Sequence, residues 1–237
     1  MTVASLFAFA GCEKHEDDIT PIVTPLFSVS EGHQVRFAPG NLVYDTNAGY
    51  RFAVNQYDYG GYFGWGTGSN PTLVSRNDEK YPTFDDWGSH IDGGWRTLTC
   101  DEWNYVATGR TDAAAKCGAA TVCGVHGIVL LPDDWYGGAI NAGFDGNGWG
   151  QNVYDASTWS DMETAGAVFL PASGFHIRTT SKVRVLYGRG SLGNYWSSSP
   201  YDSTSNAYSM YFDSVDVNAA YHKNRHYGRS VRLVRDI

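Results

Sequence analysis

The chain has no surplus of basic residues, because 17 Lys and Arg stand against 25 Asp and Glu and the formal net charge is −8 at pH 7. Without a basic surface it cannot release counterions from phosphates, so nucleic acid is not expected as a partner. Charged residues are also scarce, at 18% of the chain. This composition excludes a coiled coil, a helical bundle and a disordered chain.

The apolar segment at residues 2–10 is too short to span a bilayer, which takes about 20 residues. It ends in small residues, as a secretory signal does. Residues 9–12 (FAGC) resemble a bacterial lipobox, which implies that Cys12 is lipidated and becomes the N-terminus of the mature protein. We therefore expect residues 1–12 to be a lipoprotein signal peptide with its lipobox.

The next residues, 13–24 (EKHEDDITPIVT), are acidic and then contain proline, with no apolar periodicity. Such a stretch is typical of a solvated tether. Acidic residues directly after a lipidated cysteine resemble the surface-export signal of lipoproteins in some Gram-negative gut bacteria. We therefore expect a tether at residues 13–25, one folded domain at residues 26–237, and an outer-membrane lipoprotein exposed at the cell surface.

Cysteine is scarce as well, with 4 residues in the chain. Cys117 and Cys123 are close enough in sequence to pair across a turn, but three buried thiols, Cys100 included, fit equally well. No His stands at ligand spacing beside these cysteines. His222 and His226 have the spacing of a helical zinc pair, but their stretch has no helical pattern. We therefore expect no metal and no cofactor.

Glycine is abundant, at 28 residues, and aromatic residues make up 15% of the chain. Because aliphatic residues are few, rings have to fill the core, and most of the tryptophans are expected to be buried. The irregular segment at residues 57–95 is typical of a functional or specially packed loop. Short segments bounded by Gly, Asn or Pro predict antiparallel strands at residues 27–29, 35–37, 42–44 and 51–54.

Two capping boxes predict helices. The box at residues 99–102 opens a helix that carries Trp103 inward, and the box at residues 160–163 opens a shorter one. Each helix is followed by an apolar run bounded by Gly and Pro, which predicts buried strands at residues 128–131 and 168–170. These elements predict an α+β protein with small antiparallel sheets, two short helices and long loops rich in glycine and aromatic residues.

Residues 208–213 alternate in polarity, which predicts a strand with one core face and one outward face. The core face is expected to hold Tyr208, Met210 and Phe212, and the outward face Ser209, Tyr211 and Asp213.

Three segments carry a family resemblance. Residues 94–103 (GWRTLTCDEW), 196–199 (WSSS) and 228–235 (GRSVRLVR) resemble, in order and spacing, motifs of the formylglycine-generating-enzyme branch of the C-type lectin fold. The resemblance covers most of residues 26–237 and implies a C-type-lectin-like fold for that domain. A fold of this kind carries several functions, so activity has to be argued from the residues.

An enzymatic function is not expected. Formylglycine-generating enzymes hold copper through cysteines in their C-terminal part, and here no cysteine follows Cys123. The Glu-Pro-Asn, Gln-Pro-Asp and Trp-Asn-Asp motifs of calcium-dependent sugar lectins are also missing from the sequence. Residues 145–147 form a fragment of a calcium loop without its later acidic ligand. An enzyme of the formylglycine-generating type is therefore the least favoured alternative.

The C-terminal part of the chain has the composition of a recognition surface. Residues 201–227 are rich in Tyr, Ser, Asp, Asn and His, and residues 194–237 contain no Glu and no Gln. The enriched residues are encoded by codons that arise when the adenines of an Asn codon change, whereas Glu, Gln, Lys, Met and Trp codons do not arise this way. This pattern resembles the variable region of proteins diversified by retroelements, and predicts one at about residues 187–230.

The resemblance implies a diversified ligand-binding surface whose partner is an unidentified protein or glycan. A fixed surface adhesin, or a component of a surface complex with the same fold, is the alternative. Arg225, Arg229, Arg232 and Arg235 are expected to be scaffold groups. The expected ligand-binding residues are Tyr201, Ser203, Ser205, Ser209, Tyr211, Asp213, Asp216, Asn218, Tyr221, His222, His226 and Tyr227.

Overall fold

The structure is a computed structural model and describes residues 25–74, 83–140, 148–179, 181 and 183–237. The predicted signal peptide with Cys12, nearly all of the predicted tether and the calcium-loop fragment at residues 145–147 lie outside the described residues. Within the described ranges, no helix combines the length and the apolar character that a membrane crossing requires.

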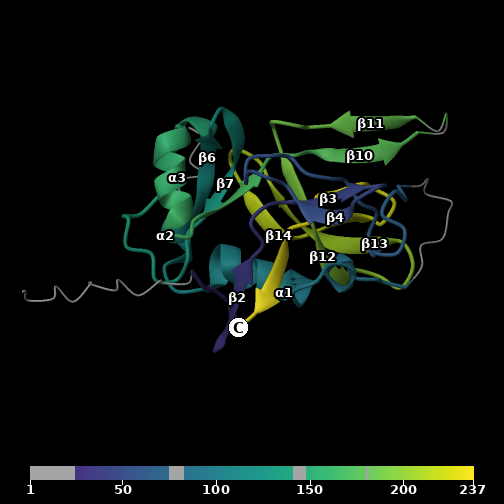
Figure 1. Cartoon of the computed structure of the whole chain (residues 1–237), viewed down its shortest axis with the longest axis horizontal. Coiled ribbons are helices and arrows are strands. Elements are labelled where there is room, and N and C mark those ends of the chain that lie inside the picture. The colour runs from purple at the N-terminus through teal and green to yellow at the C-terminus, as the bar shows by residue number, and fades with distance from the viewer. Residues whose placement is uncertain (1–24, 75–82, 141–147, 180, 182) are drawn as a thin grey trace, which may run out of the picture.

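The first sheet joins the two ends of the described chain. It contains β1 (Phe27–Ser30), β2 (His33–Phe37), β15 (Leu233–Asp236) and β5 (Trp95–Thr97), in the order β1-β2-β15-β5 with antiparallel pairs. The C-terminal strand β15 is therefore held between two segments from the first half of the sequence (Figure 1). The strands predicted at residues 27–29 and 35–37 are confirmed as parts of β1 and β2.

The second sheet carries a core on each face. Its strands are β8 (Val153–Tyr154), β6 (Cys117–Val122), β7 (Val125–Leu130) and β9 (Val168–Pro171), in that order, with β8 parallel to β6. On one face Trp159 of α3 (Ala156–Thr164) packs against Phe169 of β9, with 5.8 Å between ring centroids. On the other face Ile128 and Leu130 join the main core. The two predicted buried strands are thus confirmed within β7 and β9.

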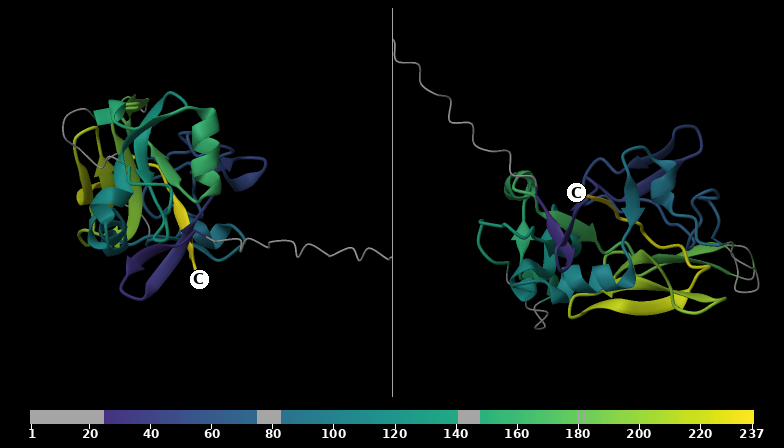
Figure 2. Two further views of the ribbon diagram at one scale, coloured as in Figure 1. Left: turned by 90° about the vertical axis from the view of Figure 1, so that its left-hand side faces the viewer. Right: turned by 90° about the horizontal axis from the view of Figure 1, so that it is seen from below.

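The third sheet is built from the C-terminal part of the chain. It contains β12 (Gly193–Pro200), β13 (Asn206–Phe212) and β14 (Val217–Asn224), all antiparallel, with β13 in the middle. Helix α1 (Cys100–Asn104) lies along one face of this sheet, against β13 and β14 (Figure 2). Two hairpins, β3 (Leu42–Asp45) with β4 (Gly49–Phe52) and β10 (Phe175–Arg178) with β11 (Arg184–Tyr187), lie nearby (Figure 1).

The helices agree with the sequence prediction in part. The Thr99 capping box of α1 is present, and the chain continues into a π-helical turn, η2 (Tyr105–Gly109), with Trp103 buried. The second predicted helix begins earlier than expected, because Asp155 and not Ser160 caps α3 by accepting a hydrogen bond from the Thr158 N–H. Short elements that the sequence did not predict are α2 (Ala113–Lys116), η1 (Trp87–His90) and η3 (Gly148–Gly150).

The fold class differs from the prediction. The architecture is mostly β, with 40% strand and 15% helix, so an α+β protein of the C-type-lectin-like class is the wrong description. The physical reason is that the apolar segments are short and end at glycine or proline, and such segments pair into small sheets. The two α-helices that have a side-chain N-cap, α1 and α3, are longer than α2, which has none. Even so, α3 spans just 9 residues.

Aromatic side chains fill the core, as the composition predicts. Trp87, Trp103 and Trp196 have no exposed surface, and Trp159 is 2% exposed. Their indole N–H groups need acceptors when buried. Trp196 satisfies this requirement by donating from Nε1 to the carbonyl of Phe63 at 2.7 Å, whereas Nε1 of Trp87 and Nε1 of Trp159 have no hydrogen-bond partner among the described residues.

The three described cysteines are free thiols. Cys117 begins β6 and Cys123 directly follows its last residue, so an extended strand separates them by roughly 20 Å. A disulfide between them is excluded by this separation. Of the two alternatives, free thiols are correct, although Cys123 is only half-buried.

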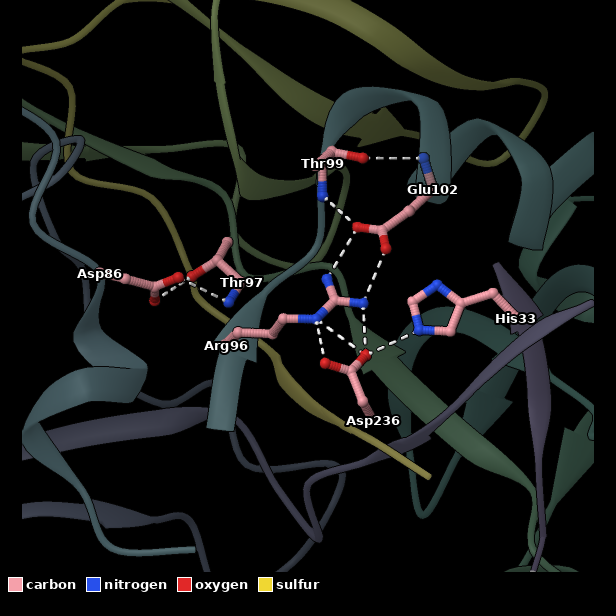
Figure 3. Close-up of polar contacts among 7 residues, drawn as sticks. All are labelled: His33, Asp86, Arg96, Thr97, Thr99, Glu102 and Asp236. Carbon is pink, nitrogen blue, oxygen red and sulfur yellow. Dashed lines mark hydrogen bonds and ion pairs between the residues drawn. The ribbon is translucent and has the colours of Figure 1, made fainter. Parts of the chain in front are cut away.

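A polar network ties the first sheet to α1 (Figure 3). Arg96 on β5 donates to both carboxylate oxygens of Glu102, at 2.8 and 2.7 Å, and to Asp236 on β15 at 2.7–3.0 Å. Nε2 of His33 on β2 lies 3.1 Å from Asp236. The hydrogen bonds from Arg96 lower the pKa of Asp236. Burial alone would raise the pKa of Glu102, but hydrogen bonds from Arg96 and the Thr99 N–H outweigh it and lower that pKa.

We expect Arg96→Met to lower the free energy of unfolding at neutral pH by about 1–2 kcal/mol, because it leaves a half-buried carboxylate without its partner. A carboxylate with a lowered folded-state pKa contributes stability above its unfolded pKa of about 4, and loses that contribution as the pH falls. The difference between the variant and the wild type should therefore shrink below about pH 4. Urea unfolding of both proteins at neutral and acidic pH measures this difference in the free energy of unfolding.

The matched control is Glu31→Gln, which removes an exposed carboxylate from the same sheet's first turn and should change stability little at either pH. If Arg96→Met lowered the free energy of unfolding equally at both pH values, the result would contradict an ionic role for Arg96.

Candidate ligand-binding site

The sheet of β12, β13 and β14 has two different faces. Met210 and Phe212 have no exposed surface and join the main core with Tyr195. Because side chains alternate along a strand, the intervening residues point to the opposite face. Tyr211 lies directly opposite Asn194 on β12 and Asn218 on β14 in the strand register, so one face of the sheet is core and the other is available for contact.

A cavity of about 480 Å³ lies on this second face. Phe175 of β10 and Leu192, from outside the sheet, form part of its wall. Five of the predicted binding residues also line it: Tyr211, Asp216, Asn218, Tyr221 and Tyr227. The volume lies within the range of about 300–1,000 Å³ that is typical of small-molecule sites.

Tyr211 is held in place by the turn that follows its strand. Its hydroxyl donates to Asp213 Oδ2 at 2.8 Å, and its ring lies 4.8 Å from that of Tyr221. Asp213 Oδ1 accepts the N–H groups of Val215 and Asp216, so the carboxylate also organises the turn. Burial, followed by the hydrogen bond to Asp213, raises the pKa of Tyr211 to about 12. Tyr211 therefore presents a neutral hydroxyl to the cavity at physiological pH.

The floor of the cavity consists of two buried residues that the sequence did not single out for ligand binding. Arg229 and Asn194 both line the cavity and are each 1% exposed. The Arg229 guanidinium lies 4.6 Å above the Trp196 ring and 5.5 Å from the Tyr221 ring. Its Nη1 donates to the hydroxyl of Ser209.

Three predictions about individual side chains are wrong. Ser209 was expected outward but has no exposed surface, because Arg229 bonds its hydroxyl and Tyr221 lies opposite it in the register. His226 was expected on an exposed loop but is 5% exposed, because its turn folds inward and its N–H donates to Asn224 Oδ1.

Tyr208, expected in the core, is only half-buried. Its ring instead packs edge-on against Tyr201 at 5.3 Å, at the end of β13 away from Phe212. Tyr201 stacks in turn on His222 at 3.6 Å with an interplanar angle of 1°. Two predicted binding residues thus form an aromatic cluster separate from the cavity.

The loop after β12 holds the remaining predicted residues. Asp202 Oδ1 accepts the N–H groups of Thr204, Ser205 and Asn206, and these bonds, with Ser205 the strongest, lower the pKa of Asp202. Ser203 on this loop lines a second cavity of about 430 Å³, together with Trp65 and Arg225 among others. The predicted residues therefore lie in several places, which include the first cavity, the aromatic cluster of Tyr201 and His222, and the loop after β12.

Reactive groups are unfavourably placed in the described part of the chain. Burial raises the pKa of the Cys117 thiol to about 12 and also raises that of Cys100 and Cys123. Each thiol is thereby disfavoured as the thiolate that attacks or binds metals. Across the described ranges, no group of three or more His, Cys, Asp or Glu side chains is arranged to hold a metal ion.

Comparison with known proteins gives one match. Residues 150–234 match the model of a family described as a domain of unknown function (DUF8237). No curated protein and no solved structure matches the chain. The matched segment includes the whole β12–β14 sheet and both floor residues of the cavity, Asn194 and Arg229.

Sequence reasoning missed the floor of the cavity for a physical reason. Arg229 lies in the motif at residues 228–235, where an arginine is expected to pair within the scaffold. Phe175 is distant in sequence and reaches the site only because β10 packs beside Tyr227, with their rings stacked at 5.6 Å. Strand alternation identifies which residues share a face, but it does not identify which segments close over that face.

The two faces of β13 and β14 should respond differently to substitution. Met210→Ala removes buried volume and is expected to lower the free energy of unfolding by about 2–5 kcal/mol. Met210→Leu, which conserves volume, should cost less than about 1.5 kcal/mol. Asn218→Ser, on the cavity face, keeps an oxygen for the Ala220 N–H and should change stability by at most about 0.5 kcal/mol. Equal losses in urea unfolding for Met210→Ala and Asn218→Ser would contradict the two-faced sheet.

Proposed function

We propose that this protein is a surface-displayed lipoprotein that binds a protein or glycan ligand through the cavity face of its β12–β14 sheet, and that it is not an enzyme. One observation carries the proposal. Five residues expected from composition to contact ligand surround one cavity, while Met210 and Phe212, on the opposite face of β13, have no exposed surface. A rigid sheet with an exposed polar and aromatic face is suited to recognition without chemistry.

The residues around the cavity have the chemistry of a recognition surface. Tyr211, Tyr221 and Tyr227 provide rigid ring area at low cost in conformational entropy. Asn218 and Asp216 provide adaptable hydrogen-bonding groups beside them. The aromatic cluster of Tyr201, Tyr208 and His222 extends the exposed aromatic area beyond the cavity.

Diversification by a retroelement is the second part of the proposal. Its support is the lack of Glu and Gln in residues 194–237, together with the burial of residues that such mutagenesis does not generate. Trp196 and Met210 belong to that group and are fully buried, as constant scaffold positions should be. Lys223 lines the cavity and would be a constant position within the variable surface. Exposed positions tolerate exchange because surface substitutions usually change stability by at most about 0.5 kcal/mol.

The absence of enzymatic activity is also part of the proposal. Its support is that burial raises the pKa of each of the three described thiols, so that none favours the thiolate that copper and oxygen chemistry requires. A copper titration that found a tight stoichiometric site would argue for the enzyme instead.

Sequencing the 3′ end of the gene from many cells of one population tests diversification. We expect substitutions confined to adenines within the codons for residues 187–230, with a near-identical invariant copy and a reverse transcriptase gene beside it. The codons for residues 26–186 serve as the internal control and should be uniform. A uniform 3′ end without a nearby copy would overturn diversification and leave a fixed adhesin.

Fractionation of cells tests the anchor. Cys12→Ala is expected to move the protein from the membrane pellet to the soluble fraction, because the lipid chains supply the buried CH₂ groups that hold it. Cys100→Ala, which removes a buried thiol from the domain, should leave the protein in the pellet. Protease added to intact wild-type cells should digest the domain. Pelleting of Cys12→Ala, or protection from protease, would contradict the surface lipoprotein.

A further inference from the structure

Two buried donor groups at the floor of the β12–β14 cavity have no acceptor. Nε of Arg229 and Nδ2 of Asn194 are both buried without a hydrogen-bond partner among the described residues. Arg229 carries five N–H donors, and within the described part of the chain only Nη1 is bonded, to the neutral hydroxyl of Ser209. No carboxylate oxygen of the described residues lies within 4.0 Å of this guanidinium.

Other buried arginines of the chain are better compensated. Arg110, with a side chain that is 1% exposed, pairs with Asp133 at 3.1 Å. Arg232 has no exposed surface, and it donates to the side-chain oxygens of Gln56 at 2.5 Å and Asn41 at 3.5 Å. Nε of Arg232 also has no partner among the described residues, but Arg232 makes two other side-chain bonds and Arg229 makes one. A buried charge is costly unless it is paired and hydrogen-bonded, so Arg229 is the least compensated of these arginines.

The charges around the cavity favour an anion at its floor. Burial lowers the pKa of Arg229, and no acidic side chain of the described residues is among the groups that oppose this shift. Lys223 lines the same cavity and adds a second cation. Asp216 is the acidic residue of the lining, but it forms no ion pair with Arg229, and its charge raises the pKa of Tyr211.

The aromatic walls of the cavity indicate which kind of molecule bears the anionic group. Phe175 stacks on Tyr227 at 5.6 Å with an interplanar angle of 14°, and Tyr211 and Tyr221 add further rings. Aromatic faces pack against the C–H faces of a small ring, and tyrosine hydroxyls together with Asn218 can bond hydroxyl groups. A cavity of about 480 Å³ holds a ring-sized group, which is larger than an aspartate or glutamate side chain.

We propose that this cavity binds an acidic sugar residue, with the sugar carboxylate on Arg229 and Asn194 and the sugar ring against the aromatic wall. The inference rests on the proposed ligand-binding function and names its ligand class. A guanidinium forms strong charge-assisted hydrogen bonds to a carboxylate, and the second floor donor gives the anion a fixed orientation. In this arrangement Arg229, like Lys223, would be a constant position within the proposed variable surface.

Isothermal titration calorimetry of the full-length chain at neutral pH, with matched ionic strength, tests the inference. The probes are glucuronate and glucuronamide, which share the same ring and differ in charge. Glucuronate is expected to bind about 10- to 100-fold more tightly, because hydrogen bonds between charged partners are lost with the amide. This comparison uses the wild-type protein and needs no variant to fold.

Variants then test whether Arg229 causes the preference for glucuronate over glucuronamide. Arg229→Gln should abolish the preference for glucuronate, and Arg229→Lys should restore part of it. Arg225→Gln is the matched control, because it removes a cation from the second cavity and should keep the preference. The near-ultraviolet circular dichroism spectrum reports whether each variant retains its packed aromatic core. Loss of the preference in a folded Arg225→Gln would overturn the assignment to Arg229.

The remaining outcomes separate this inference from the proposed function. Equal binding of both probes would overturn the acidic ligand while leaving a ligand-binding cavity. Binding of neither probe, up to high millimolar concentration, would overturn the acidic-sugar assignment, and the population sequencing would still decide the proposed function. Tighter, Arg229-dependent binding of a short polyglutamate peptide would overturn the sugar and assign the site to acidic protein segments.

Discussion

The structure depends on one backbone segment, residues 228–234, whose hydrogen bonds join sheets that would otherwise be separate. Gly228 exchanges N–H and carbonyl bonds with His176 of β10, and Arg229 exchanges them with Phe63. The next residues bond to β12 and to Leu42 of β3, and the chain then enters β15 between β2 and β5. Small sheets are marginal alone, so a segment that bonds to several of them makes their folding cooperative.

The same segment links stability to the candidate site. Its backbone is hydrogen-bonded on both sides, so Arg229 and Arg232 lie in the interior even though burying their charge costs free energy. Arg232 meets amide oxygens there, whereas Arg229 meets Trp196, Tyr221 and a serine hydroxyl at the floor of a cavity. A buried cation held by backbone bonds is preorganised for an anion, because its position is already fixed before binding.

Local patterns predicted local structure well in this chain. The Thr99 capping box, the buried strands within β7 and β9, and the buried side chains of Met210 and Phe212 all follow from spacing along the sequence. The prediction of an α+β class was wrong, because capping signals mark where a helix begins and do not measure how much of the chain is helical. The prediction that Ser209 is exposed was wrong for a similar reason. Alternation along a strand predicts which face a residue lies on, but it does not predict that Arg229 covers that face at Ser209.

The sequence by itself determined the composition of residues 194–237 and which residues of β13 share a face, because these depend on residue identity and on the period of a strand. The tertiary structure alone decided that Arg229, Asn194 and Phe175, from three separate segments, close around Tyr211 and Tyr221. It also decided that Arg229 would lie there without an acidic partner in the described chain. These arrangements depend on long-range backbone pairing, which no local spacing encodes.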